Sequence, residues 1–124
     1  MATPTSTTTP RPLPDALVEL VAERFRIIGE PMRIRLLDRL REGPSGVGEL
    51  AEALGASQQN VSKHLSTLHR GGVVGRHKEG NRVVYTVTDP SVFALCDAVC
   101  GGLRERVAAL AQIVADAPGP GTSA

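Results

Sequence analysis

The sequence is poor in aromatic residues and in cysteine. Its 124 residues include no Trp, one Tyr, two Phe and two Cys. With so little aromatic area, the core has to be built from Leu, Val, Ile and Ala, which favours packed helices. Two cysteines are too few for a small secreted domain held together by disulfides, so we expect both to be thiols in a reducing compartment.

Long apolar segments are also missing. No run approaches the about 18 to 20 apolar residues that a membrane span needs, and residues 1–14 lack the apolar core of a secretory signal. Basic and acidic residues nearly balance, 14 against 13. The length suits one small domain. We therefore expect a soluble cytoplasmic protein with no membrane partner.

Recognisable catalytic motifs are absent as well. The sequence GPSGVG at residues 43–48 joins two predicted helices and contains no Lys, so we interpret it as a connector and not as a phosphate-binding loop. The predicted elements bring together neither a Ser/His/Asp set nor a pair of carboxylates in a cleft. We do not expect an enzyme.

Composition changes towards both ends of the chain. Residues 1–14 are rich in Thr and Pro, and residues 117–124 are rich in small residues, Pro and Gly. Such segments bury too little apolar area to offset the entropy lost on ordering. We predict two disordered tails that flank a folded domain spanning residues 15–116.

Helical spacing dominates this domain. Apolar residues repeat at helical intervals in five segments, and residues that favour helix ends mark their limits. Asp15 is expected to cap the first helix and Ser57 the fourth. In the second helix, Ile34, Leu37 and Leu40 are expected to face the core. The predicted helices span about residues 15–28, 31–41, 47–54 and 58–70, and a last helix opened by Asp89, Pro90 and Ser91 extends to about Val114.

Between the last two helices the spacing changes to that of strands. Residues 73–74 and 83–87 are mostly β-branched or aromatic, and the segment HKEGNR between them carries Gly80 and Asn81. These two residue types are typical of a hairpin turn. The sequence therefore predicts a two-stranded β-ribbon.

Positive charge is concentrated between Ser57 and Thr88. Five basic residues there oppose one acidic residue, a net charge of +4, while nine basic and twelve acidic residues elsewhere give −3. His64, His69 and His77 lie in the same segment and can add charge beside a polyanion. This distribution is typical of a nucleic-acid-binding surface, although a solvated basic surface would show the same charge.

The spacing of residues 47–70 predicts a helix-turn-helix. A short helix, a two-residue connection and a Ser cap precede a second helix with Val61, Leu65 and Leu68 on one face. The opposite face carries side chains that can pair with base edges or phosphates in the major groove. For His64, at the border of the two faces, a packing or phosphate-contacting role and a base-contacting role remain equally open. The predicted contacts are Ser57, Gln58, Gln59, Ser62, Lys63, His64 and Ser66.

The tip of the predicted ribbon is polar. Lys78, Asn81 and Arg82 are placed to reach backbone phosphates or the neighbouring minor groove, although ribbon tips are often polar only because water surrounds them. Double-stranded DNA is thus the predicted partner. A winged-helix module that binds another protein is the rival interpretation.

Three segments, taken in order, resemble the ArsR/SmtB family of bacterial winged-helix repressors. They are GEPMRIRLLDRLREG, ELAEALGASQQNVSKHLSTLHRGGVV and RHKEGNRVVYTV, within a resemblance that covers about residues 20–110. The resemblance implies a mostly helical α+β fold, the winged helix-turn-helix, with four helices, two strands and a final helix. It also implies a transcriptional repressor that binds an inverted-repeat operator as a symmetric homodimer.

The same resemblance implies that the first and last helices form the subunit interface. Independently, the last helix is strongly apolar and so small a chain has little interior in which to bury it. The predicted interface residues are Leu17, Leu20 and Val21 in the first helix, with Cys96, Val99, Leu103, Val107 and Leu110 in the last.

Two effector sites of the family are missing from this sequence. Where its arsenic and cadmium sensors carry Cys-x-Cys in the third helix, this chain has Ala51 and Ala53. The Asp-x-His motif of its zinc and nickel sensors has no counterpart, because Pro and Ser follow Asp89 and no His occurs after His77. The resemblance therefore implies neither site here.

Cys96 and Cys100 remain as candidate effector ligands. At this spacing their Cβ atoms lie roughly 5 to 6 Å apart on one helix face, so both thiolates can converge on one soft metal or metalloid ion such as arsenite. A third ligand would have to come from the partner subunit, Asp97 or an exogenous thiol. The alternatives are that the cysteines only pack, which gives an effector-free regulator, or that they respond to oxidation or persulfides. No ion is expected to be required for folding.

Overall fold

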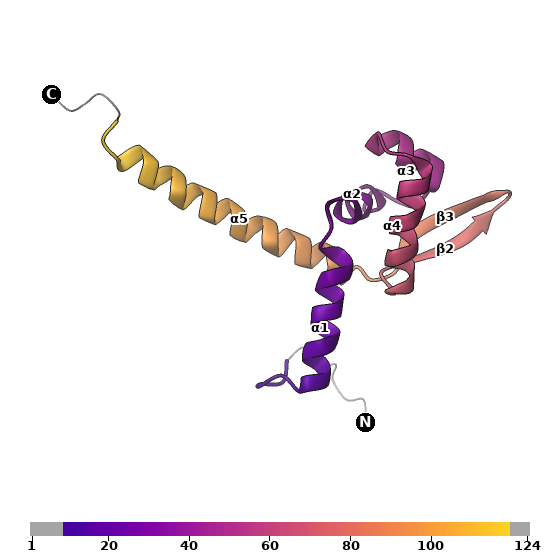
Figure 1. The fold of residues 1–124 in the computed structure, drawn as a ribbon, viewed down its shortest axis with the longest axis horizontal. Coiled ribbons are helices and arrows are strands. Elements are labelled where there is room, and N and C mark those ends of the chain that lie inside the picture. The colour runs from indigo at the N-terminus through magenta and orange to yellow at the C-terminus, as the bar shows by residue number, and fades with distance from the viewer. Residues whose placement is uncertain (1–8, 120–124) are drawn as a thin grey trace. The chain divides into compact units, whose positions relative to one another are not determined.

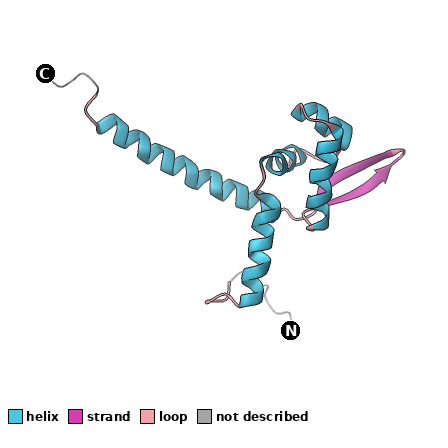
Figure 2. Ribbon diagram, in the orientation of Figure 1, coloured by secondary structure: helices cyan, strands magenta, loops and turns pink. Residues whose placement is uncertain are grey.

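The computed structural model describes residues 9–119 (Figure 1). Residues up to Asp89 form one compact unit, and residues from Pro90 onward form a second, which consists mainly of one helix. Helices make up most of the described chain (Figure 2). Of the two predicted tails, residues 9–14 and 117–119 contain no helix or strand, and the remainder lies outside the described residues. Within the described range no helix is long and apolar enough to cross a membrane.

The predicted helices are all present. Four lie in the first unit and the fifth, α5, makes up most of the second. Their bounds agree with the predicted ones to within two residues, because strong end signals flank each apolar repeat. The helices are α1 (Asp15–Ile28), α2 (Pro31–Leu40), α3 (Val47–Leu54), α4 (Gln58–Arg70) and α5 (Ser91–Asp116).

The turn between α3 and α4 is set by two residues. Gly55 ends α3 in the left-handed conformation, with φ of 61°, which glycine adopts without steric cost. The Ser57 side chain accepts a hydrogen bond of 3.1 Å from the backbone N–H of Asn60 and so caps α4. The predicted cap of α4 is confirmed.

The predicted cap of α1 is wrong. Pro14 occupies the capping position and forms no side-chain capping bond, while Asp15 is the first helical residue. The carboxylate there still interacts favourably with the positive end of the helix dipole. The cap of α2, which the sequence analysis did not identify, is Glu30, whose side chain accepts a 3.0 Å hydrogen bond from the backbone N–H of Arg33.

The inner face of α2 is rotated from the predicted one. Leu37 and Leu40 are buried as expected, but Leu36 is also fully buried and Ile34 is exposed. Arg33 lies on the same side as Leu36 and Leu37, and its guanidinium binds α1 carbonyls. An inward Arg is not recognisable from apolar spacing alone, so the spacing pointed to Ile34 instead.

The core of the first unit lies between the helices and a small sheet. α4 packs against α2, α3, α1 and one strand. Gly71, just after α4, allows a close approach of α1, since a Cβ there would lie 2.6 Å from the Cδ1 atom of Ile27. The largest fully buried side chains of this unit are Leu36, Leu37, Leu50, Val61, Leu65, Leu68, Val73 and Val84.

The sheet has three antiparallel strands in the order β1-β3-β2. The predicted ribbon is formed by β2 (Val74–Glu79) and β3 (Arg82–Val87), joined by a turn in which Gly80 has φ of 64°. The third strand, β1 (Ser45–Gly46), pairs with β3 through Ser45–Tyr85 and Gly46–Val84. The interpretation of residues 43–48 as a plain connector was therefore incomplete, because a two-residue strand has no alternation to detect.

Candidate nucleic-acid interface

The two faces of α4 differ in polarity and in exposure. Val61, Leu65 and Leu68 are fully buried and hold the helix against the core. The other face is turned outward and carries the predicted base-contacting side chains. Of these, Ser57, Gln58, Gln59, Ser62 and Lys63 are exposed, and Ser66 is half-buried.

The start of α4 is slightly hollowed. Ser57, Gln59, Asn60 and Lys63 line a shallow depression of about 350 Å³. Three of them can donate or accept hydrogen bonds through neutral groups, and Lys63 adds a positive charge. A phosphate or a base edge would therefore meet both hydrogen-bonding groups and a cation at this end of the helix.

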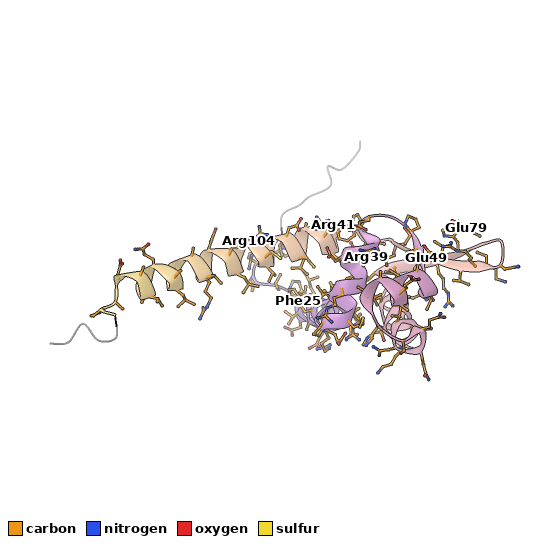
Figure 3. All side chains as sticks on the ribbon, turned by 90° about the horizontal axis from the view of Figure 1, so that it is seen from above. Phe25, Arg39, Arg41, Glu49, Glu79 and Arg104 are labelled. Atoms are coloured by element: carbon orange, nitrogen blue, oxygen red, sulfur yellow. The ribbon has the colours of Figure 1, made fainter. Side chains whose placement is uncertain are left out.

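The β2–β3 hairpin forms a wing beside α4 (Figure 1). Lys78 and Asn81 are exposed near its tip, where Figure 3 labels the neighbouring Glu79. Arg76 is also exposed and shares a strand face with Lys78, because alternate residues point to the same side. Arg76 was not among the predicted contacts, although strand alternation in the sequence could have placed it there.

The last predicted wing residue, Arg82, is held by α3. Its guanidinium forms an ion pair with Glu49 of α3, and both side chains remain about half exposed. The sequence placed Arg82 at the wing tip beside Lys78 and Asn81. The structure keeps Arg82 at the turn end of β3, opposite Glu79, and pairs its guanidinium with the first helix of the helix-turn-helix.

His64 does not lie on the exposed face of α4. Only 8% of its surface is exposed, and it is a buried polar residue in a core of apolar side chains. This burial favours the packing alternative over a contact with base edges. The physical reason lies outside α4, because α2 supplies polar partners that make burial of the ring tolerable.

The partners of His64 come from the start of α2. Its Nδ1 atom lies 3.3 Å from Nη1 of Arg33 and 3.6 Å from Oε2 of Glu30. Partial desolvation raises the pKa of the Glu30 carboxyl, but the backbone N–H of Arg33 and the nearby His64 charge outweigh it. The pKa of Glu30 is therefore lowered, and the group is a carboxylate at neutral pH.

The two cysteines lie on α5. Cys96 is half-buried and Cys100 is exposed. Within residues 9–119, no group of three or more His, Cys, Asp or Glu side chains is arranged to hold a metal ion. Asp89, which precedes α5, lies 3.3 Å from Nη1 of Arg24 and so forms an ion pair with α1.

Both α1 and α5 carry exposed apolar side chains. On α1, Leu20 and Phe25 are 67% and 54% exposed, and Val21 is also exposed while Leu17 is half-buried. Side chains surround α5 along its length in Figure 3, with Arg104 labelled on it. On that helix Leu103 and Val107 are 56% and 64% exposed, together with Val99, Leu110, Ile113 and Val114. Exposed apolar area of this kind marks an interaction surface.

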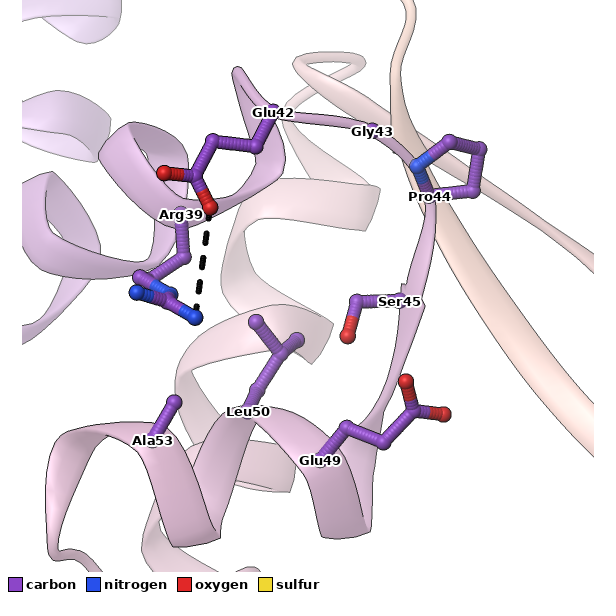
Figure 4. Close-up of a pocket in the computed structure, with 8 residues that line it drawn as sticks. All are labelled: Arg39, Glu42, Gly43, Pro44, Ser45, Glu49, Leu50 and Ala53. Atoms are coloured by element: carbon purple, nitrogen blue, oxygen red, sulfur yellow. Dashed lines mark ion pairs between the residues drawn. The ribbon is translucent and has the colours of Figure 1, made fainter.

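A small pocket of about 190 Å³ lies between the end of α2 and the start of α3 (Figure 4). It includes Ala53, one of the two positions where the resemblance called for Cys, and an ion pair of 3.9 Å between Arg39 and Glu42. Leu50 forms part of its wall (Figure 4).

Comparison with known proteins connects this fold to bacterial regulators. Residues 30–75 match the family described as bacterial regulatory protein, arsR family. The chain is 34% identical over 104 residues to the uncharacterised HTH-type transcriptional regulator Rv0081 of Mycobacterium tuberculosis, covering 80% of this chain and 91% of that one. The crystal structure of Rv0081 superposes with a TM-score of 0.65 at 35% identity, covering 82% and 99% of the two chains.

Two further solved structures are similar. The homodimeric winged helix-turn-helix DNA-binding domain of Mb0332 from Mycobacterium bovis has a TM-score of 0.66 and 28% identity, covering 78% of this chain and 95% of that one. The antimony-specific transcriptional repressor AntR has a TM-score of 0.66 and 26% identity, covering 86% and 96%. The predicted winged helix-turn-helix fold is therefore confirmed.

The lowered pKa of Glu30 makes stability depend on pH. A carboxyl whose folded-state pKa is depressed stabilises the fold above its unfolded pKa, and this contribution is lost as pH falls through the folded-state value. We expect the free energy of unfolding of the unsubstituted protein to fall more steeply than that of Glu30→Gln between about pH 6 and about pH 3. Urea unfolding at constant protomer concentration measures this difference. Glu52→Gln, which removes an exposed carboxylate of α3, is the control, and parallel profiles for parent and Glu30→Gln would contradict the prediction.

Proposed function

The chain belongs to the arsR family of bacterial regulatory proteins, and we propose that it represses transcription by binding an inverted-repeat operator as a homodimer. The relatives are transcription regulators and not enzymes. The observation that carries the proposal is the outward polar face of α4, which lies in the basic segment beside a wing with exposed Arg76 and Lys78. Such a regulator acts in the cytoplasm, where bacterial DNA lies.

The contacts follow from the chemistry of the α4 face. A helix fits the major groove, where Gln58 and Gln59 can pair with adenine and Lys63 can donate to guanine. Ser57, Ser62 and Ser66 suit phosphates or bases, and the wing adds phosphate contacts. In a symmetric dimer the two α4 helices would enter successive major grooves about 34 to 36 Å apart. The distance between the two α4 helices of the dimer then determines the affinity for operator DNA.

We assign the dimer interface to α1 and α5. Their exposed apolar side chains include Leu20, Leu103 and Val107, and burial of such area stabilises association by about 25 cal/mol per Å². The homodimeric state of the related Mb0332 domain supports the assignment. Leu17, Val21, Cys96, Val99 and Leu110 complete the proposed interface.

A soft ion at Cys96 and Cys100 is the proposed signal. The similarity to an antimony-specific repressor supports a thiolate ligand set, because antimony, like arsenic, is a soft metalloid. Cys96 and Asp97 already take part in interactions within the chain, so an ion would have to compete with them. Binding that favours another dimer geometry would weaken DNA binding, and DNA would weaken ion binding equally.

The DNA-binding proposal is tested on the DNA upstream of the gene, at several salt concentrations. We expect Lys63→Ala and Gln59→Ala each to weaken specific binding by about 10-fold, since a good base contact contributes about 1–3 kcal/mol. Arg35→Ala, which removes an exposed cation from α2, serves as the matched control and should have little effect. Absence of binding by the parent protein even at low salt would overturn the repressor proposal in favour of a protein-binding module.

The interface assignment is tested with a charge on α5. We expect Leu103→Asp and Val107→Asp to shift the protein from dimer to monomer at micromolar concentration, because an unpaired buried carboxylate is costly. Arg104→Gln on the same helix is the control and should remain dimeric. Sedimentation velocity reports the oligomeric state and circular dichroism the helix content. Dimers of unchanged stability in both Asp variants would refute the assignment.

The effector proposal is tested by titrating the protein–DNA complex with arsenite, Zn²⁺ or a persulfide donor. We expect arsenite to release DNA from the parent protein and to have no effect on Cys96→Ser/Cys100→Ser, because Ser lacks the soft thiolate. Fluorescence anisotropy of labelled DNA follows the release, and binding without effector shows whether the variant is intact. Equal release from parent and variant would eliminate the thiol site, whereas release by the persulfide donor alone would indicate redox sensing.

A further inference from the structure

The Nδ1 atom of His64 lies between a group that can only donate hydrogen bonds and a group that can only accept them. Nη1 of Arg33 is 3.3 Å away and Oε2 of Glu30 is 3.6 Å away. A guanidinium has donors only, and a carboxylate has acceptors only. Nδ1 can therefore satisfy one of these neighbours at a time, and its protonation state selects which one.

Arg33 connects this nitrogen to α1. Its Nε donates a hydrogen bond of 2.6 Å to the carbonyl oxygen of Ile27, and Nη2 donates one of 3.3 Å to that of Arg26. Both carbonyls lie in the last turn of α1, where no further helical N–H is available to them. A single guanidinium thus ties the end of α1 to the middle of α4.

The neutral imidazole completes this connection. With its proton on Nε2, the ring offers the Nδ1 lone pair to Arg33. When the ring is protonated, the lone pair is gone and a positive charge faces the guanidinium. The N–H that forms at Nδ1 can donate only to Glu30. Protonation therefore breaks the hydrogen bond to Arg33, which contacts α1, and replaces it with a hydrogen bond to Glu30 at the start of α2.

Apart from Glu30 and Arg33, the charged side chains of the elements that surround α4 form no hydrogen bond or ion pair with the His64 ring. Four elements pack against α4, namely α1, α2, α3 and β2. The charged partners of the His64 ring are Glu30 and Arg33, both at the start of α2. On α1, Glu23 forms an ion pair with Arg26, and Arg24 forms one with Asp89. Glu49 of α3 pairs with Arg82, and His77 of β2 pairs with Glu79. The remaining charged side chains of these described elements form neither a hydrogen bond nor an ion pair with the ring: Asp15, Glu19, Arg35, Asp38, Arg39, Glu52, Arg76 and Lys78.

We propose that Glu30, Arg33 and His64 are positioning residues that couple α1 to the DNA-reading helix, and that DNA binding requires the neutral form of His64. The inference rests on the proposed function, in which α1 joins the two subunits and α4 enters the groove. Loss of the Arg33 contact loosens α4 relative to α1, and hence loosens the spacing of the two α4 helices in the dimer. Acidification then weakens DNA binding. Protonation of an exposed His near phosphate would act in the opposite direction.

The test separates these two effects. His69→Asn/His77→Asn, which leaves His64 as the sole histidine, is the reference protein. We expect its DNA affinity to fall by about 10-fold between about pH 7.5 and about pH 5.5, the size expected for one hydrogen bond to a charged group. Addition of His64→Asn, which keeps an acceptor close to the Nδ1 position and does not titrate, should restore the affinity at low pH. Addition of His64→Leu should weaken binding at both pH values.

A spectroscopic measurement needs neither DNA nor substitution at position 64. In the reference protein with ¹⁵N-labelled histidine, the ring nitrogens should show the Nε2–H tautomer at neutral pH. An Nδ1–H tautomer would overturn the inference, as would DNA binding whose pH profile is the same with His64 and with Asn at this position. Absence of DNA binding by the parent protein would instead overturn the proposed function. If His64→Leu does not fold, as judged by circular dichroism, the Asn variant and the tautomer still decide the matter.

Discussion

The arrangement of the first unit depends on the burial of one face of α4. Val61, Leu65 and Leu68 are inaccessible to solvent because α2, α3, α1 and β2 surround that side of the helix. Three buried apolar side chains of this size contribute roughly 1.5–3 kcal/mol each. Their burial requires the opposite face, with Gln59 and Lys63, to point outward. The same interaction that stabilises the fold therefore presents the polar surface.

A polar link crosses this apolar core. Arg33 binds the carbonyls at the end of α1 and the ring of His64 on α4, and Glu30 caps α2 and lies 3.6 Å from the same ring. Buried polar groups that are mutually satisfied specify one arrangement of the helices more narrowly than apolar packing does. The link joins a helix that exposes Leu20 and Phe25 to the helix whose outer face exposes Gln59 and Lys63. An interaction at one surface thereby has a physical route to the other.

Unlike α4, the helix α5 leaves most of its apolar side chains exposed. Most of its apolar residues, including Leu103 and Val107, are exposed in the protomer, although the helix is long and ordered across the Gly101–Gly102 pair. Helices in water are stabilised mainly by packing of an apolar face. In the proposed dimer, a second copy of the chain would supply such packing.

The sequence by itself determined the elements: the spacing of apolar residues and the end signals at Gly55 and Ser57 are local, so the helix limits and the wing followed from them. It also identified the exposed side of α4, because polar and apolar residues alternate with the helical period. Only the tertiary structure showed that His64 is buried, that Arg82 pairs with Glu49 and that Ser45 and Gly46 form a strand. In each of these cases the deciding partner is at least 30 residues away along the chain. A contact across that distance depends on how the helices pack, and no local pattern of residues encodes it.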